Sequence, residues 1–309
     1  MKKKTFISVG ECMVELQAAD DGQYRLGFAG DTLNTAWYVK ALTNPRKATV
    51  DYFTSIGIDH LSQKMKSFFN ANEIGTRFIR ETSERTVGLY LITLTGVERN
   101  FTYWRNNSAA RLLADDEGHL RSTFSQADFI YFSGVTLAIL SPHHRKILLS
   151  VFRDLKLLGV TIVFDTNARR RLWQSDTAMK KAMIEGYKVA TVALPTFDDD
   201  CAVFGDTTPA DCVKRIASYG VHEIVVKNGS KPCLLLIGND LIAVPPEPVE
   251  GIVDTTGAGD SFNAGYISGR LAGMDPLEAV KLGHRVAGRV ICRRGALLDM
   301  QGFADLAVN

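Results

Sequence analysis

Short apolar runs alternate with segments of helical spacing along most of this 309-residue chain, and this alternation constrains the fold most strongly. The runs are rich in β-branched and aromatic residues, which is typical of parallel strands that are buried on both faces. They occupy residues 6–9, 50–53, 129–132, 160–164, 189–193 and 224–226, and helical segments lie at 33–42, 62–70, 142–158, 176–187 and 209–219. The pattern predicts an α/β fold with a doubly wound, mostly parallel sheet, helices on both faces, and ligands at the carboxyl ends of the strands.

Two segments depart from this alternation, at residues 11–29 and 86–105. The first has strand-like runs at 13–16 and 24–28 around a turn at 20–22. The second is typical of a hairpin, with strands at 87–94 and 100–104 and a turn at 95–97. We expect both segments to form a small antiparallel β lid inserted in a single domain of residues 1–309. A lid suits a kinase, because water excluded from the site cannot compete as the acceptor; an ordinary edge extension is the alternative.

Composition excludes several classes of partner. The net charge of +2 favours neither a nucleic acid nor a membrane surface. No segment approaches the ~18–20 apolar residues of a membrane span. The five cysteines form no paired motif, as expected in a reducing compartment. We therefore expect a cytoplasmic protein whose ligands are small molecules.

A run of small residues near the C-terminus carries the chemistry. In Asp254-Thr255-Thr256-Gly257-Ala258-Gly259-Asp260, three small residues precede an aspartate and then a segment of helical spacing. The amides of Gly257, Ala258 and Gly259 would lie at a helix N-terminus, where they can bind an anion. Asp260 places a proton acceptor beside them, and a plain N-cap would not need three small residues before it. The combination favours phosphoryl transfer from a nucleotide to an alcohol.

The segment from Asp254 to Phe262 resembles the C-terminal signature of the PfkB, or ribokinase-like, carbohydrate kinases. The run Ala29-Gly30-Asp31-Thr32-Leu33-Asn34-Thr35-Ala36 is similar, more loosely, to the N-terminal signature of that family. The resemblance covers nearly the whole chain. It implies a kinase that uses ATP and Mg²⁺, and it allows a monovalent cation such as K⁺.

Five stretches look like the members of this family that phosphorylate 2-keto-3-deoxygluconate at its terminal hydroxyl, which gives the 6-phosphate. They are Gly10-Glu11-Cys12-Met13-Val14-Glu15-Leu16, Gly30-Asp31-Thr32-Leu33-Asn34-Thr35, Tyr103-Trp104-Arg105-Asn106, Leu137-Ala138-Ile139-Leu140-Ser141-Pro142 and residues 165–173. Arg105 also favours a sugar acid, because a guanidinium binds a carboxylate with two N–H donors, and a neutral sugar does not require one. A fructokinase-like enzyme and a kinase for the galactonate-derived epimer are the nearest alternatives.

Two further classes differ in kind. A dinucleotide-dependent oxidoreductase would use Gly257-Ala258-Gly259 as part of its fingerprint, but Phe262 stands at the third glycine position. A sugar-binding regulator without catalysis would not need the intact Asp260.

The resemblance implies a role for each matching residue. Asp260 would be the general base, ionised at neutral pH at its helix N-terminus, and the amides of Gly257, Ala258 and Gly259 would form the anion hole. The sugar would contact Gly30, Asp31, Thr32, Leu33 and Asn34 at a loop before a helix, Tyr90, Tyr103, Trp104 and Arg105 on the lid, and Arg169, Asp254 and Asp260. Tyr90 as a core residue, Asp254 as a turn residue after a strand and Arg169 in a surface ion pair are the alternatives.

The nucleotide would contact Asn167, Arg169, Thr196, Lys227, Asn228, Gly229 and Ser230 as well as the amides of residues 257–259. Relatives place Gly-x-x-Gly in the loop at 229, where Pro232 takes the second position. The run Thr196-Phe197-Asp198-Asp199 stands where many relatives have Asn-x-x-Glu, so Asp199 is the candidate acid that holds Mg²⁺ through water. Acids in the first turn of a helix are the alternative. An exposed lid sheet could also pair between subunits of a homo-oligomer.

Overall fold

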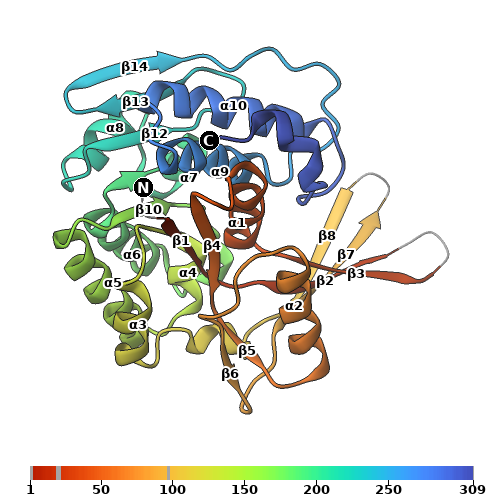
Figure 1. Cartoon of the computed structure of the whole chain (residues 1–309). Helices are drawn as coiled ribbons and strands as arrows, with labels where there is room; N and C mark the ends of the chain where they lie inside the picture. The colour runs from red at the N-terminus through yellow and green to blue at the C-terminus, as the bar shows by residue number, and fades with distance from the viewer. Residues whose placement is uncertain (1–2, 19–21, 96–97, 309) are drawn as a thin grey trace.

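The computed structural model of the chain describes residues 3–18, 22–95 and 98–308 (Figure 1). Its strands are β1 (Lys4–Val9), β2 (Met13–Ala18), β3 (Tyr24–Ala29), β4 (Ala48–Phe53), β5 (Ser55–Gly57), β6 (Arg80–Thr82), β7 (Gly88–Thr95), β8 (Glu98–Trp104), β9 (Phe129–Ser133), β10 (Thr161–Asp165), β11 (Val192–Ala193), β12 (Glu223–Val226), β13 (Cys233–Ile237) and β14 (Asp240–Val244). Its helices are α1 (Asp31–Leu42), α2 (His60–Ala71), α3 (Glu117–Phe124), α4 (Gly134–Ile139), α5 (Pro142–Leu157), α6 (Asp176–Val189), α7 (Phe197–Phe204), α8 (Pro209–Ala217), α9 (Ala258–Leu271) and α10 (Pro276–Ile291), with 3₁₀ turns η1 (Ala109–Leu112), η2 (Arg170–Leu172) and η3 (Met300–Leu306).

The main sheet has the strand order β14-β13-β12-β11-β10-β9-β1-β4. The pairs from β4 to β12 are parallel, and β13 and β14 add an antiparallel edge. The predicted doubly wound, mostly parallel sheet is confirmed. The run at 189–193 contributes only Val192–Ala193 as strand, because α6 continues to Val189 and uses the first part of the run as helix.

Each face of this sheet carries its own core, because successive residues of a strand point to opposite faces. Phe6 of β1 packs with α1, α9 and α10, while its neighbour Ile7 packs with α3, α5, α6 and α8. Both residues have no exposed surface. Helices therefore cover both faces, and the edge formed by the carboxyl ends of the strands remains available for ligands.

The strand order reverses at β1, which lies between β9 and β4. From this position the chain builds β4 on one side and the series β9 to β12 on the other. Loops that leave neighbouring strands toward opposite faces create a crevice at such a point. We therefore expect a ligand site at the carboxyl ends of β1, β9 and β10.

A second sheet, with the order β3-β2-β7-β8, projects from the main body (Figure 1). Its two hairpins, β2 with β3 and β7 with β8, are antiparallel as predicted. The pairing of β2 with β7 is parallel, so the lid is a mixed sheet. The difference arises because the chain returns to the main body between the two hairpins, and β7 then leaves it in the same direction as β2. The turns predicted at 20–22 and 95–97 lie largely outside the described residues.

Within the described ranges, no helix combines the length and the apolar composition that crossing a membrane requires.

Candidate active site

Segments far apart in the sequence meet at the strand ends beside β1. Asp31, the first residue of α1, accepts hydrogen bonds from Ser133 at the end of β9 and from Asn167 Nδ2 beyond β10, the latter at 2.7 Å. One turn along α1, Asn34 Nδ2 donates to Asp260 Oδ2 at 2.8 Å. The N-terminal and C-terminal motifs of the sequence therefore form one site, and Asn167 belongs to it.

The loop before Asp260 has the backbone geometry of an anion-binding turn. Gly257 has a φ of 77°, and a Cβ there would lie 3.3 Å from the backbone of Ala296, so the position requires glycine. The amide of Ala258 is not free as predicted, because it donates to the Thr255 carbonyl at 3.2 Å. Within the described part of the chain, the amides of Gly257 and Gly259 donate to no acceptor. We call residues 257–259 the anion loop.

The carboxyl group of Asp260 is not simply ionised. Burial, and after it the neighbouring carboxylate of Asp31, raise its pKa to about 7, and the hydrogen bond from Asn34 opposes this rise. Desolvation and a like charge outweigh the helix dipole, so the helix N-terminus does not hold the pKa of Asp260 low as predicted. A pKa near the working pH is the property that favours a general base.

A buried polar cluster lies beneath the anion loop. Lys227 Nζ donates to Asp165 Oδ2 at 3.0 Å and to Asn263 Oδ1 at 2.8 Å, and Asn263 Nδ2 donates to Asp165 at 2.7 Å. The side chain of Lys227, which was predicted to contact the nucleotide, is 8% exposed and belongs to this cluster. Sequence reasoning missed Asp165 and Asn263. The available signal was charge at the end of apolar strands, because buried charges are almost always paired.

The residues predicted as a sugar loop belong instead to the start of α1. Gly30 is the N-cap, and a Cβ on it would lie 2.3 Å from the Glu11 carbonyl oxygen, so only glycine fits. The side chains of Thr32 and Leu33 point into the core, where Thr32 Oγ1 bonds the Tyr52 hydroxyl at 2.7 Å. They offer a ligand only their backbone. Ala29, which ends β3, does not have a positive φ, so alanine fits this position without backbone strain.

The side-chain amide of Asn34 uses its donor group, but its acceptor oxygen is left without a partner among the described residues. This oxygen, Oδ1, is buried. A buried acceptor of this kind is costly unless something donates to it. A hydroxyl bound beside Asp260 is a suitable donor, because it would bond Asn34 Oδ1 and approach the carboxylate at the same time.

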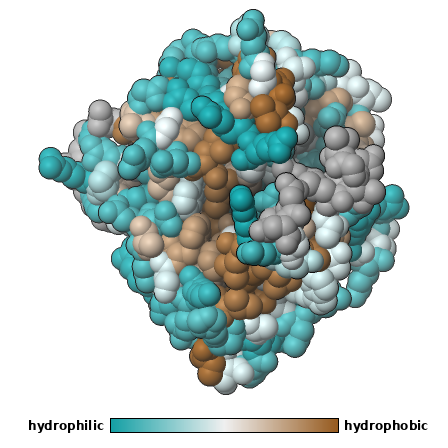
Figure 2. All heavy atoms as spheres, turned by 90° about the vertical axis from the view of Figure 1, so that its right-hand side faces the viewer, coloured by the Kyte–Doolittle hydropathy of each residue, from teal (hydrophilic) through white to brown (hydrophobic). Residues whose placement is uncertain are grey.

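The predicted lid residues divide into two kinds. Tyr90 is 8% exposed and its hydroxyl donates to Glu15, whereas Tyr103 and Trp104 are 48% and 57% exposed. The rings of Tyr90 and Tyr103 are 5.7 Å apart, so the exposed ring rests on the buried one. Figure 2 views the molecule from the lid side and shows brown apolar surface exposed next to polar groups on this face. Tyr90 therefore supports the lid, and Tyr103 and Trp104 are accessible.

Arg105, at the base of the lid, forms a buried ion pair with Glu11. The two side chains are 10% and 0% exposed, and glycine at position 88 leaves room for them, since a Cβ there would lie 2.8 Å from Glu11 Oε1. Arg105 Nε and Glu11 Oε1 are buried without partners among the described residues. Sequence reasoning missed Glu11. The guanidinium thus has one carboxylate already and donors to spare for another.

The predicted nucleotide residues lie along the ends of β10, β11 and β12. Thr196 caps α7 and pairs with Lys227 through an isolated β-bridge, which aligns the two loops. Gly229 has a φ of 58°, and both Gly229 and Ser230 are exposed. Asn228 Nδ2 donates to the Pro232 carbonyl at 3.4 Å, and this contact closes the turn.

Asp199, the candidate acid for Mg²⁺, keeps a carboxylate that is 30% exposed. Its Oδ2 accepts a hydrogen bond from the Ala168 amide at 3.2 Å and lies 3.9 Å from Arg169 Nη1, and burial raises its pKa. Arg169 itself is 57% exposed. A single, partly exposed acid is compatible with Mg²⁺, which keeps several waters and is held mainly by phosphate oxygens.

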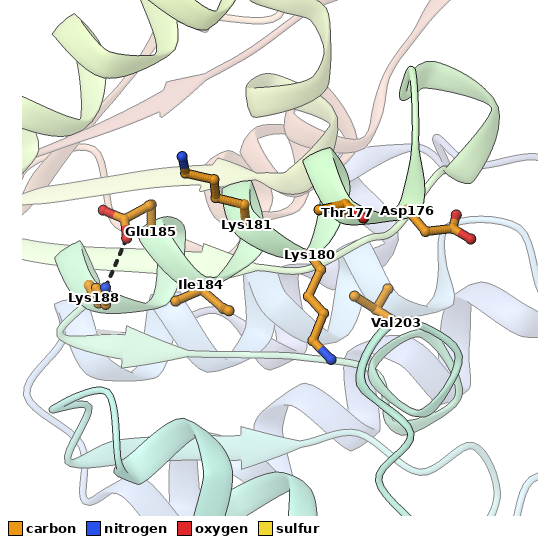
Figure 3. Close-up of a pocket in the computed structure, with 8 residues that line it drawn as sticks. All are labelled: Asp176, Thr177, Lys180, Lys181, Ile184, Glu185, Lys188 and Val203. Atoms are coloured by element: carbon orange, nitrogen blue, oxygen red, sulfur yellow. Dashed lines mark hydrogen bonds and ion pairs between the residues drawn. The ribbon is translucent and has the colours of Figure 1, made fainter.

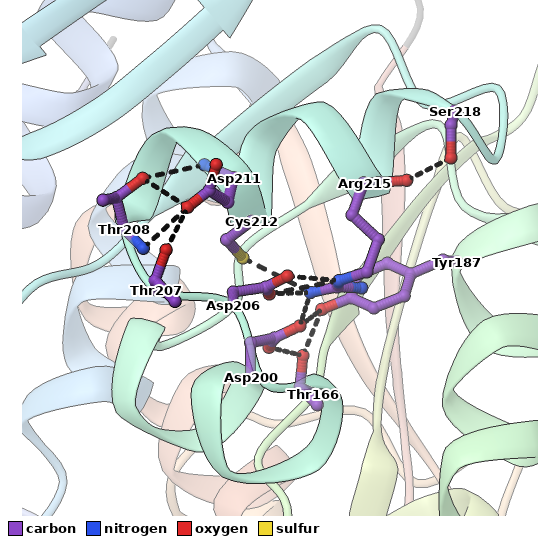
Figure 4. A network of polar contacts seen from close by, with 10 residues as sticks. All are labelled: Thr166, Tyr187, Asp200, Asp206, Thr207, Thr208, Asp211, Cys212, Arg215 and Ser218. Carbon is purple, nitrogen blue, oxygen red and sulfur yellow. Dashed lines mark hydrogen bonds and ion pairs between the residues drawn. The ribbon is translucent and has the colours of Figure 1, made fainter.

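A neighbouring acid cluster is structural. Asp200, Asp206 and Cys212 could reach one ion, but Arg215 occupies the space between them and bonds both carboxylates at 2.6 Å (Figure 4). Asp200 also accepts hydrogen bonds from Thr166 and Tyr187. Burial raises the pKa of Asp200 to about 6. The network ties α7 to α6, α8 and the loop after β10, and so fixes the elements that carry Asp199 and Asn167.

Asp254 lies in a turn, and the strand predicted before it is absent from the described residues. Its Oδ1 accepts from the Thr256 amide and hydroxyl at 3.1 and 2.7 Å, and its Oδ2 accepts from the Gly295 amide at 2.9 Å. It therefore joins the loop before α9 to the loop after α10. Without a strand directly before the glycines, the dinucleotide-binding interpretation also loses its required context.

A hollow between α6 and α7 lies apart from this site (Figure 3). Its lining consists of Asp176, Thr177, Lys180, Lys181, Ile184, Glu185, Lys188 and Val203. None of these is a predicted site residue, and Lys188 is paired with Glu185 at 2.9 Å.

The chain is similar to known proteins over its whole length. The 2-dehydro-3-deoxygluconokinase of Escherichia coli (strain K12) is 38% identical and covers 98% of this chain and 99% of its own, and that of Dickeya dadantii is 39% identical with the same coverage. Among solved structures, aminoimidazole riboside kinase from Salmonella enterica superposes with a TM-score of 0.83 at 20% identity over 98% of this chain and 97% of its own. The 2-dehydro-3-deoxygluconokinase of Thermotoga maritima gives 0.82 at 18% over 99% and 98%.

These structural likenesses support the fold, and the sequence likenesses support the family. The model of the pfkB family carbohydrate kinases matches residues 3–301, which includes every residue of the site described above. The chain therefore belongs to the pfkB family of carbohydrate kinases.

Proposed function

We propose that this kinase transfers the γ-phosphoryl group of ATP to the terminal hydroxyl of 2-keto-3-deoxygluconate, which gives 2-keto-3-deoxy-6-phosphogluconate and ADP. The observation that carries the proposal is the contact of Asn34 with Asp260, which joins the sugar-side helix to the anion loop. Relatives with 36–39% identity over nearly the whole chain are named 2-dehydro-3-deoxygluconokinase, another name for the same activity, and this supports the substrate.

In this proposal Asp260 is the general base. It takes the proton of the acceptor hydroxyl as that oxygen bonds to the γ-phosphorus and the bond from phosphorus to the bridging oxygen of ADP breaks. Asn34 orients the carboxylate through Nδ2 and accepts a sugar hydroxyl at Oδ1. A base so placed contributes about 10²–10⁴-fold to the rate.

The anion loop receives the phosphoryl group through the amides of Gly257 and Gly259, which donate to no acceptor among the described residues. Losing one such donor typically costs about 2.7–4 kcal/mol of transition-state stabilisation, more than a helix dipole provides. Thr196, Asn228, Gly229, Ser230 and Arg169 line the nucleotide side. Asp199 would hold a Mg²⁺ ion through water, and the ion would supply positive charge that neutralises the phosphates. A monovalent cation such as K⁺ also belongs to the proposal, and comparing turnover in K⁺ and tetramethylammonium salts tests it.

Recognition of the sugar acid falls to the base of the lid. Arg105 binds the substrate carboxylate with donors that Glu11 leaves free, and its buried position strengthens the interaction. Tyr103 covers the sugar when the lid closes, with Tyr90 beneath it, whereas Trp104, the next residue of β8, lies on the opposite face of the lid sheet. Asp31 and the backbone of Gly30 bond the hydroxyls. Asp254 acts by holding the loop before α9 in place.

The lid is also the proposed contact between subunits. Its exposed apolar side chains include Tyr24, Leu26, Phe101, Tyr103 and Trp104. An uncovered sheet of this kind favours pairing with a second copy. Sedimentation of the wild type and of Phe101→Asp tests this part, because a lid dimer should dissociate and a monomer should be unaffected.

The substrate is tested by ADP release with 2-keto-3-deoxygluconate, its galactonate-derived epimer, fructose, ribose and adenosine. We expect the highest kcat/KM with 2-keto-3-deoxygluconate. A higher value with the epimer would keep the mechanism and change the substrate, whereas ribose or adenosine as the best acceptor would contradict the assignment. Sugar binding without ADP release would indicate a regulator.

A further inference from the structure

Lys227 is a buried lysine whose position is fixed at both ends. Its Nζ is held by Asp165 and Asn263 at 3.0 and 2.8 Å. Its backbone amide donates to the Pro195 carbonyl and its carbonyl accepts from the Phe197 amide, each at 2.8 Å. A lysine held by side-chain and backbone bonds cannot swing toward a ligand as a mobile surface lysine would.

The ammonium group lies directly against the anion loop. A Cβ added to Gly259 would be 3.6 Å from Lys227 Nζ, so no side chain separates the charge from the loop backbone. Asn263, which holds the ammonium, lies on α9 one turn beyond Asp260. The lysine therefore faces the first turn of α9 from below, while the amide of Gly259 donates to no acceptor in the described part of the chain.

The partners of this lysine are a carboxylate and an amide, which form one buried cluster with it. Asp165 Oδ2 accepts from both Lys227 and Asn263, and Asn263 Nδ2 also contacts the Tyr131 hydroxyl at 3.1 Å. All four residues are buried. Breaking one member of a buried ion pair is costly, yet replacing both by apolar groups often is not, so stability alone does not explain why a charged pair stands here.

We propose that Lys227 is a positioning residue for phosphoryl transfer: its side chain, held by Asp165 and Asn263, places an ammonium group under the anion loop. There it stabilises both the phosphoryl group in transit and the ionised form of Asp260. The proposal rests on the kinase function proposed above. Preorganised charge of this kind acts without reorganisation at the moment of reaction, which is why it contributes to catalysis.

The charges around Asp260 support this role. The carboxylates of Asp31 from α1 and Asp165 from β10 raise its pKa, and Lys227 lowers it. The other titratable groups that face Asp260 are Tyr38 from α1 and Tyr131 from β9, whose own pKa values are raised mainly by burial, so both stay neutral. Lys227 thus supplies the positive charge in this set, and Asp165 opposes it.

Three variants test the inference through ADP release with 2-keto-3-deoxygluconate between pH 5 and 9. In Lys227→Met the acid limb of kcat/KM should move to higher pH by about one unit, and kcat should fall at least roughly tenfold. In Asp165→Asn the limb should move to lower pH. The double variant, Asp165→Asn with Lys227→Met, removes the charges as a pair and keeps the shape. Its limb should stay near that of the wild type, while its kcat falls roughly tenfold.

Lys181→Met, at an exposed site on α6, is the matched control and should behave as the wild type. The inference would be overturned if the acid limb of kcat/KM did not move in the single variants, or if it moved in the same direction in both. If a single variant does not fold, the double variant decides: wild-type kcat overturns the inference and a tenfold loss supports it. Failure of the wild type to release ADP would contradict the proposed function instead.

Discussion

Asn34 donates a hydrogen bond to the carboxylate of Asp260 across 2.8 Å, although 226 positions separate the two residues in the sequence. The bond joins the first helix of the chain to the helix that begins at the anion loop. Thr35 reinforces the contact with a 3.2 Å bond from its hydroxyl to the Asp260 carbonyl oxygen. The proposed sugar side and phosphate side of the site are therefore held in register by α1 and α9.

Asn34→Ala should lower kcat roughly tenfold and move the acid limb of kcat/KM to higher pH. The hydrogen bond from Asn34 lowers the pKa of Asp260, so its loss makes the carboxylate easier to protonate. Thr35→Val is the matched control, because it removes the bond to the carbonyl but leaves the carboxylate untouched. Equal shifts of the limb in both variants would contradict the role of Asn34.

The activity of the wild type should depend on the ionisation of Asp260. Its pKa is about 7, and only the ionised form accepts a proton. With the sugar acid as the varied substrate, kcat/KM should rise about tenfold per pH unit below pH 6 and level off above pH 8. A profile that is flat from pH 5.5 to 8.5, measured by ADP release, would exclude Asp260 as the base.

The same group should reduce stability as the pH rises. The pKa of Asp260 is raised in the folded state from its ordinary value of 3.8 to about 7. A group of this kind stabilises the fold most below pH 4, and this contribution is lost as the pH rises through 7. Asp260→Asn should therefore melt several degrees above the wild type at pH 8, and the gap should narrow toward pH 5. A difference in melting temperature that stays constant from pH 5 to pH 8 would contradict the raised pKa of Asp260.

The buried pair of Glu11 and Arg105 should set the preference for acids. Arg105→Ala alone leaves Glu11 unpaired and buried, which lowers the free energy of unfolding by about 3–5 kcal/mol. The effect of this variant on substrate binding therefore cannot be separated from its effect on stability. Glu11→Gln combined with Arg105→Met removes both charges at nearly constant shape. We expect its KM for 2-keto-3-deoxygluconate to rise roughly 10-fold to 100-fold, while its KM for fructose stays within about threefold. An equal change for both sugars would show that Arg105 does not recognise the carboxylate.

Much of the fold follows from local sequence. Apolar runs such as that around Ile7 must be buried on both faces, and this alone predicts parallel strands covered by helices. The small residues before Asp260 likewise predict a helix that begins at an open turn, because Gly257 adopts a positive φ that few other residues tolerate. Both predictions depend on neighbours within a few residues.

The details of the site depend on contacts between distant segments, which the sequence does not display. The burial of Lys227 follows from Asp165 and Asn263, which approach it only in the folded sheet. The high pKa of Asp260 depends on Asp31, and the restraint on Arg105 depends on Glu11. Thr32 was expected in a loop before the helix. The helix instead begins at Asp31, two residues earlier than expected, and this turns the Thr32 side chain toward the core.

The most direct test compares the rate of ADP release by the wild type and by Asp260→Asn at pH 8 with saturating ATP, Mg²⁺ and 2-keto-3-deoxygluconate. The variant keeps the size of the side chain and its contact with Asn34, so sugar binding measured by calorimetry should remain within about threefold. We predict a loss of about 10²–10⁴-fold in kcat. A folded variant that binds the sugar and turns over within tenfold of the wild type would contradict the account.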